Sequence, residues 1–161
     1  MRKHPIIRRI LTAALLPLAM GAVAVVPAQA TPVRTTAVTA APAQNCAGRL
    51  IDRKVASYNG SPVAELVVYY KDGQNCARLN HLGATRGVRL RTSVFLVACQ
   101  QTRPGPLCAF HGRPAAQDGA FTHFAGPVRV RAGGRCIHAA GDIYFHGKRH
   151  LETSPAASHC R

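Results

Sequence analysis

Residues 63–80 read VAELVVYYKDGQNCARLN, two strand-like runs on either side of a turn. The first run, Val63–Tyr70, is rich in the β-branched and aromatic residues that favour strands. Residues 71–75 (KDGQN) are turn-forming, and Cys76–Asn80 continues beyond them. The stretch therefore predicts a β-hairpin.

A second decisive stretch, Val88–Cys99, reads VRLRTSVFLVAC. Its first half alternates, with Arg89 and Arg91 on the face opposite a mostly apolar set: Val88, Leu90, Thr92, Val94 and Leu96. Phe95 and Val97 then make the second half apolar on both faces. This pattern predicts a strand with one face in the core.

Short strand-like runs separated by glycine and proline occupy the rest of the chain. We expect a longer loop around Gly112, Pro114 and Gly119, and no stretch outside the N-terminus shows a capped helical period. The sequence thus predicts an all-β fold, a small disulfide-stabilised β-sandwich or barrel of about seven or eight short strands. The further expected strands are 48–57, 121–125, 128–131, 135–138 and 142–146.

The first thirty residues have the three parts of a secretory signal peptide. Basic residues at 2, 3, 8 and 9 precede an uncharged, mostly apolar run over 10–26, and Ala28-Gln29-Ala30 matches a signal-peptidase site. The alternative is a retained membrane anchor, although prolines and a glycine interrupt the run. We expect a signal peptide over 1–30, a disordered Thr/Ala/Pro leader over 31–45, and a single disulfide-bonded β domain over 46–161.

Export places the six cysteines in an oxidising compartment, where an even number favours disulfides. Fifteen complete pairings are open to six cysteines. Position along the chain suggests Cys99 with Cys108 across a Pro/Gly loop, Cys46 with Cys160 joining the ends, and Cys76 with Cys136 between strands.

The chain is strongly basic, with 21 Lys and Arg against 6 Asp and Glu. Removal of residues 1–30 leaves 17 basic and 6 acidic residues, a formal charge of +11. Such a charge attracts polyanions in a salt-dependent way. If their strands are neighbours, four arginines form a candidate polyanion-binding patch: Arg89, Arg91, Arg129 and Arg131. There are two alternatives. The arginines lie on an ordinary solvent-exposed sheet face, or the high arginine content reflects the base composition of the gene.

Other site chemistries have little support in the sequence. The chain lacks a Cys-x2-Cys pair and an HExxH motif, so we expect neither a metal nor a cofactor. It also lacks a GxSxG motif, and its carboxylates form no recognisable acid–base pair. Its aromatic residues fall mostly within expected strands, which argues against a specific nucleic-acid site.

Two segments carry a family resemblance: FTHFAGPVRVRAGGRCIHAAGDIYFHG (121–147) and VVYYKDGQNCARL (67–79). With a cysteine at each end of residues 46–161, they resemble the spore-associated protein A family of filamentous actinobacteria. The resemblance implies a small exported protein of hyphae and spores without an established catalytic activity. It also implies four family cysteines, at 46, 76, 136 and 160, so that Cys99 and Cys108 are an added pair.

We therefore expect a non-catalytic exported protein, secreted or associated with the cell or spore surface, that binds an anionic wall or spore-surface polymer. No transmembrane segment is expected after signal cleavage. The alternative is a small secreted hydrolase or diffusible effector.

Overall fold

The computed structural model describes residues 45–151 and 156–161. The expected signal peptide (1–30) and all of the expected leader except Asn45 lie outside the described residues. Eight antiparallel strands form two four-stranded sheets, with a single 3-10 turn, η1 (Gly83–Thr85), among the described residues. The strands are β1 (Arg49–Tyr58), β2 (Ser61–Lys71), β3 (Gln74–His81), β4 (Leu90–Cys99), β5 (Phe110–Phe121), β6 (Phe124–Arg131), β7 (Ile137–Phe145) and β8 (Lys148–His150).

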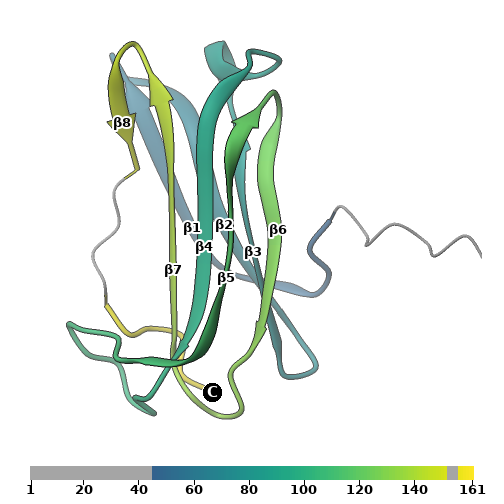
Figure 1. The fold of residues 1–161 in the computed structure, drawn as a ribbon, viewed down its shortest axis with the longest axis vertical. Coiled ribbons are helices and arrows are strands. Elements are labelled where there is room, and N and C mark those ends of the chain that lie inside the picture. Colours follow the sequence, from purple (N-terminus) through teal and green to yellow (C-terminus); the bar gives the residue numbers. More distant parts are fainter. Residues whose placement is uncertain (1–44, 152–155) are drawn as a thin grey trace, which may run out of the picture. The chain divides into compact units, whose positions relative to one another are not determined.

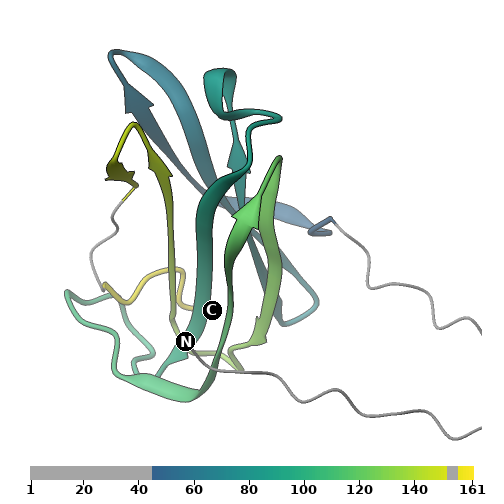
Figure 2. The same ribbon diagram turned by 45° about the horizontal axis from the view of Figure 1, so that its top comes forward.

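The two sheets pack face to face as a sandwich, with strand orders β1-β2-β3-β6 and β5-β4-β7-β8 (Figure 1). We call them sheet A and sheet B. They do not close into a barrel, and the predicted all-β class and strand number are confirmed. Figure 2 shows the chain passing between the sheets through the η1 loop, which lies at the same end as the β5–β6 hairpin.

The core lies between the sheets and is built by strand alternation. Leu66 and Leu79 point inward from sheet A, and Leu96, Ile137 and Ile143 point inward from sheet B, all fully buried. Burial of each such side chain contributes about 1.5–3 kcal/mol. The alternation predicted over Val88–Cys99 is confirmed for Thr92, Val94 and Leu96, which are all buried. It is wrong for Val88, which precedes the strand and is 45% exposed.

A second apolar cluster covers part of the outer face of sheet B. Val97 and Cys99 of β4 lie there with Cys108, Cys136 and Ala157. The C-terminal segment joins the cluster through backbone hydrogen bonds between residues 137 and 158 and between residues 105 and 157. This cover explains why the second half of β4 is apolar on both faces.

Disulfides fix three segments to the strands beside them. The structure pairs Cys99 with Cys108, as predicted, but it joins Cys46 to Cys76 and Cys136 to Cys160. The predictions Cys46–Cys160 and Cys76–Cys136 are therefore wrong. Cys76 lies in sheet A, whereas Cys136 directly precedes β7 of sheet B, so the two are on different sheets.

The loop predicted around Gly112, Pro114 and Gly119 is wrong, since all three lie within β5. In the strand order, β5 is an edge strand that pairs with β4 alone. An edge position tolerates a proline, which has no N–H to donate, and the register shifts beside Gly112 and Pro114.

The strand predicted at 121–125 is also wrong, because residues 122 and 123 form the β5–β6 turn. Neighbouring backbone holds this turn: the amide of His81 donates to the carbonyl of His123 (2.8 Å), and that of Gly87 donates to the carbonyl of Thr122 (2.8 Å). Nothing in the local sequence signals such long-range support.

Strand β7 runs through Gly141, where the sequence predicted two separate strands. A Cβ on Gly141 would lie 3.0 Å from the Ser93 carbonyl oxygen and 3.4 Å from Cδ1 of Leu79. The glycine is therefore a packing residue that lets sheet A approach, rather than a strand end. The short strand β8 was not predicted.

We expect Gly141→Val to lower the free energy of unfolding by about 1–3 kcal/mol, since the added atoms overpack the core. Urea denaturation measures the change. Ala140→Val, on the opposite face of the same strand, is the control and should cost clearly less. Equal effects would contradict a packing role for Gly141.

Two buried histidines make stability depend on pH. His81 is 1% exposed; its Nδ1–H donates to the Thr85 carbonyl (3.1 Å), and its Nε2 lies 2.8 Å from the Thr92 hydroxyl. Desolvation by burial lowers the pKa of His81, and nearby His123 lowers it further, whereas the hydrogen bond to Thr85 raises it. Burial likewise lowers the pKa of His138.

Because both pKa values are depressed in the folded state, the unfolded chain binds more protons below its histidine pKa. We expect the contribution of these two histidines to the unfolding free energy to be fully present above about pH 7 and to be lost as the pH drops through the folded-state pKa values, by at most about 1.4 kcal/mol per pH unit for each histidine. Denaturation at several pH values measures this. His81→Gln should reduce the slope, whereas substitution of exposed His111 should not; a pH-independent wild type would refute the expectation.

Candidate anion-binding surface

The structure does not bring the four predicted arginines onto one sheet, and Arg89 lies outside both sheets, directly before β4. Arg91 lies on β4 of sheet B and pairs with Asp118 of β5 at 3.4 Å, whereas Arg129 and Arg131 lie on β6 of sheet A. A side-chain hydrogen bond from Arg91 to Asp118 raises the pKa of the guanidinium, and the charge of Asp118 adds to the shift. The two strands are not sheet neighbours, so the predicted four-arginine patch does not form.

Arg129 and Arg131 nevertheless share one face, as the alternation predicted. Val128 of β6 points into the core and is buried. The two arginines point outward from the other face of the strand, beside Cys76 and Gln74 of β3. They line a groove of about 240 Å³ together with Lys71. Asp72 also lines the groove, and its main-chain oxygen accepts a hydrogen bond from Arg131 (3.4 Å).

A register shift in β6 brings an aromatic ring onto the same face. Ala77 pairs with Val128, but Leu79 pairs with Ala125, so β6 contains one more residue than β3 over this interval. Ala125 is consequently buried, and Phe124 lies on the outer face. The guanidinium carbon of Arg78 lies 4.9 Å from the centre of the Phe124 ring, within the range of a cation–π interaction.

Asn45 bridges two of the arginines. Arg78 donates to its side-chain oxygen (2.7 Å), and Arg129 donates to its main-chain oxygen (3.0 Å). Both oxygens belong to neutral groups, and the next residue is anchored by the Cys46–Cys76 disulfide. The two guanidinium groups thus converge on oxygen acceptors at one point of the sheet.

Beyond Arg78 the surface continues toward the β5–β6 hairpin. A second groove of about 430 Å³ is lined by Arg78, Arg86, His123 and Phe124, and also by Glu65. Glu65 accepts hydrogen bonds from Arg53 (2.7 Å) and from Asn80 (2.9 Å). Its charge is therefore largely compensated within sheet A.

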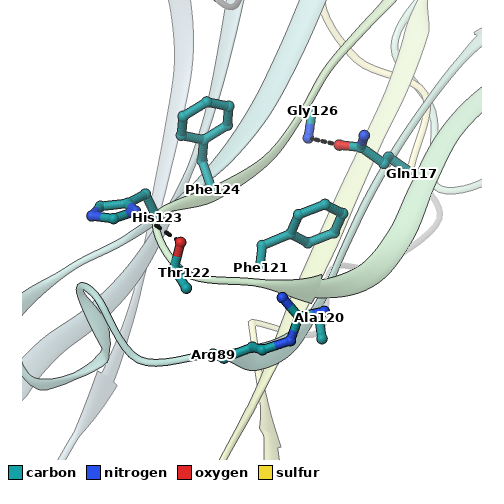
Figure 3. Close-up of a pocket in the computed structure, with 8 residues that line it drawn as sticks. All are labelled: Arg89, Gln117, Ala120, Phe121, Thr122, His123, Phe124 and Gly126. Carbon is teal, nitrogen blue, oxygen red and sulfur yellow. Dashed lines mark hydrogen bonds between the residues drawn. The ribbon is translucent and has the colours of Figure 1, made fainter.

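The third part is a cleft of about 380 Å³ where the edge strands β5 and β6 separate (Figure 3). Arg89 lies on one side of it, and the side-chain oxygen of Gln117 accepts a hydrogen bond from the amide of Gly126. His123 and Phe124 line this cleft as well as the second groove. Arg89 is therefore close to the arginines of sheet A because the β5–β6 hairpin lines both cavities, and not because these residues share a sheet.

We call these basic residues the basic track: Lys71, Arg78, Arg86, Arg89, Arg129 and Arg131. Six cations and two carboxylates, Glu65 and Asp72, line the three cavities, which leaves a formal charge of +4. Residues 124–131 of β6 alone extend about 23 Å at the usual strand rise. The track is therefore long compared with a small-molecule pocket.

Sequence reasoning found half of the track and missed Lys71, Arg78 and Arg86. The alternation of Ala77 and Leu79 in the core with Cys76 and Arg78 outside could have indicated Arg78. The contribution of Arg86 depends on how the η1 loop meets the β5–β6 turn, for which the sequence has no signal.

The described residues define a class: an antiparallel β-sandwich with three disulfides and basic residues that run along sheet A to the loop before β4. Among them no helix is long and apolar enough to cross a membrane, and no group of three or more metal-ligating side chains is assembled. No protein family, no curated protein and no solved structure matches the chain. The resemblance to the spore-associated protein A family stays a prediction.

Replacing Cys46 and Cys76 together by serine should lower the free energy of unfolding by about 3.6 kcal/mol, from the chain-entropy relation for a 30-residue separation. It should also release Asn45 from Arg78 and Arg129. Thermal denaturation measures the first effect. Stability unchanged from wild type would show that this disulfide does not constrain the unfolded chain.

Proposed function

We propose that this is an exported, non-catalytic protein of the cell or spore surface that binds an anionic envelope polymer along the basic track. The observation that carries the proposal is that six cations line three cavities, two of which share His123 and Phe124, while the Arg78–Asn45 hydrogen bond links the third to them. Five of the six are arginines, whose planar guanidinium groups can grip phosphate or carboxylate with two parallel hydrogen bonds.

The shape of the track supports a polymer as the ligand. Its cations follow the direction of β6 instead of converging on one enclosed cavity, so that an extended chain of repeating negative charges can contact several of them together. Each contact at such an exposed site is weak, and the affinity comes from their number. Salt should weaken the binding steeply.

One structural observation and two expectations from the sequence support the location. The three disulfides are compatible with an extracellular protein. The export signal expected over residues 1–30 and the resemblance to spore-associated proteins favour the envelope as the site of action. A phosphate-rich wall polymer such as a teichoic acid is the ligand we expect.

The test is binding of the folded protein to purified wall teichoic acid at several salt concentrations. We expect Arg78→Gln combined with Arg129→Gln to weaken binding at least tenfold at low salt. The slope of log affinity against log salt should fall by about 0.8 for each lost contact, if the polymer behaves as nucleic acids do.

The matched control removes two charges from outside the track, with Arg91→Gln and Arg103→Gln. This variant has the same net charge as the test variant, so any general effect of charge is equal in both. Equal loss in the two variants would show that only net charge matters, and it would overturn the track as a site. Tighter, sequence-dependent binding of DNA at physiological salt would replace the envelope polymer as the ligand.

A further inference from the structure

The outer face of sheet B carries a hollow of about 260 Å³ that takes no part in the basic track. Ser93 and Phe95 of β4 point toward it, because Val94 and Leu96 between and beyond them enter the core. Phe95 pairs with Ala116 of β5 on one side and with Ala140 of β7 on the other. The ring packs toward Phe110 (5.5 Å between ring centres) and His138 (5.9 Å), and beside its two small cross-strand neighbours it lines the hollow.

Polar groups lie one rung further along the sheet. Ser93 pairs with Asp142 of β7, and its hydroxyl donates to the carboxylate (2.8 Å), which orients that group. Arg149 of β8 also lines the hollow, and its guanidinium carbon lies 5.6 Å from the centre of the Tyr144 ring. A carboxylate and a guanidinium, each held by a neighbour, thus lie beside an aromatic ring.

The aromatic side chains of this face are unusually exposed for their size. Tyr144 is 38% exposed, and Phe110, whose ring centre lies 5.5 Å from that of Phe95, is 49% exposed. Neither ring packs into the core between the sheets. Apolar rings that stay on the surface near oriented polar groups are typical of a binding site.

Charge separates this hollow from the basic track. One carboxylate, Asp142, and one guanidinium, Arg149, line it, so that its formal charge is zero. A polyanion gains nothing from such a site. An uncharged ligand that has both an apolar face and many hydroxyl groups matches it in each respect.

We propose that Ser93, Phe95, Asp142, Tyr144 and Arg149, which we call the glycan face, bind a neutral saccharide. The C–H face of a pyranose ring packs against Phe95. The Asp142 carboxylate accepts hydrogen bonds from sugar hydroxyls, and the Arg149 guanidinium donates to sugar oxygens. The exposed rings of Phe110 and Tyr144 lie on either side of this position and extend the surface for neighbouring sugar units of a glycan chain.

The inference is independent of the proposed polyanion site, because it uses other residues on the other sheet. If both hold, the protein contacts a wall through its glycan strands on one face and through its charged polymers on the other.

The experiment is titration of the intact protein with two uncharged β-1,4-linked hexasaccharides, one of glucose and one of N-acetylglucosamine, followed by two-dimensional NMR. We expect saturable binding of at least one of them, with the largest shifts at Phe95, Asp142 and Tyr144. Raising the salt concentration should change the affinity less than twofold, since no ligand charge is involved.

Variants separate the site from folding. Asp142→Asn keeps an oxygen that can accept from Ser93, and Arg149→Gln changes an exposed strand, so both should fold; each should weaken binding at least tenfold. Phe95 also packs against the second apolar cluster, so Phe95→Ala is informative only if its amide spectrum is native. The Arg78→Gln, Arg129→Gln variant should bind the saccharide as wild type does.

Absence of saturable binding of both hexasaccharides at roughly millimolar concentration would overturn the proposal. Binding that survives both Asp142→Asn and Arg149→Gln would overturn it as well. Neither result bears on the track, because teichoic acid binding is measured separately on the same variants.

Discussion

Strand β4 is buried on both sides over its second half, and the other parts of the sandwich are arranged around this constraint. Leu96 packs into the core, while Val97 and Cys99 require a second cover. The 100–109 loop and the C-terminal segment supply it, and a disulfide holds each of them in place. Phe95 packs against the edge of that cover, and among the described residues Ser93 lies beyond it, beside the hollow of the proposed glycan face.

The sequence was sufficient where the local pattern of apolar and polar residues alone determines the structure. The alternation of apolar and polar residues correctly predicted β4 and the 63–80 hairpin. In a two-layer fold, only one orientation of such a strand buries its apolar face. Proximity along the chain likewise found the Cys99–Cys108 pair. The sequence failed where a distant partner decides: Gly141 is a packing position only because Leu79 lies opposite, and β5 accepts Pro114 only because it is an edge.

The candidate surface shows the same division. Alternation was right that Arg129 and Arg131 share a face, but the sequence contains no information on whether β4 and β6 are neighbours. The extra residue of β6 that turns Phe124 outward depends on its pairing with β3, and so does the stacking of Arg78 on that ring. The sequence was therefore enough to predict the chemical character and the face of individual side chains. It was not enough to predict which side chains of different strands lie together.

The placement of the disulfides has a mechanical consequence. None of the three joins sheet A to sheet B; each closes a segment onto its own side of the sandwich. A pulling force applied at the two ends of residues 46–160 enters through Cys46–Cys76 and leaves through Cys136–Cys160, so it bypasses β1, β2, β7 and β8. Only the chain between Cys76 and Cys136 bears the load, and it contains every residue of the basic track except Lys71, so tension on a tethered molecule would be felt first at that surface.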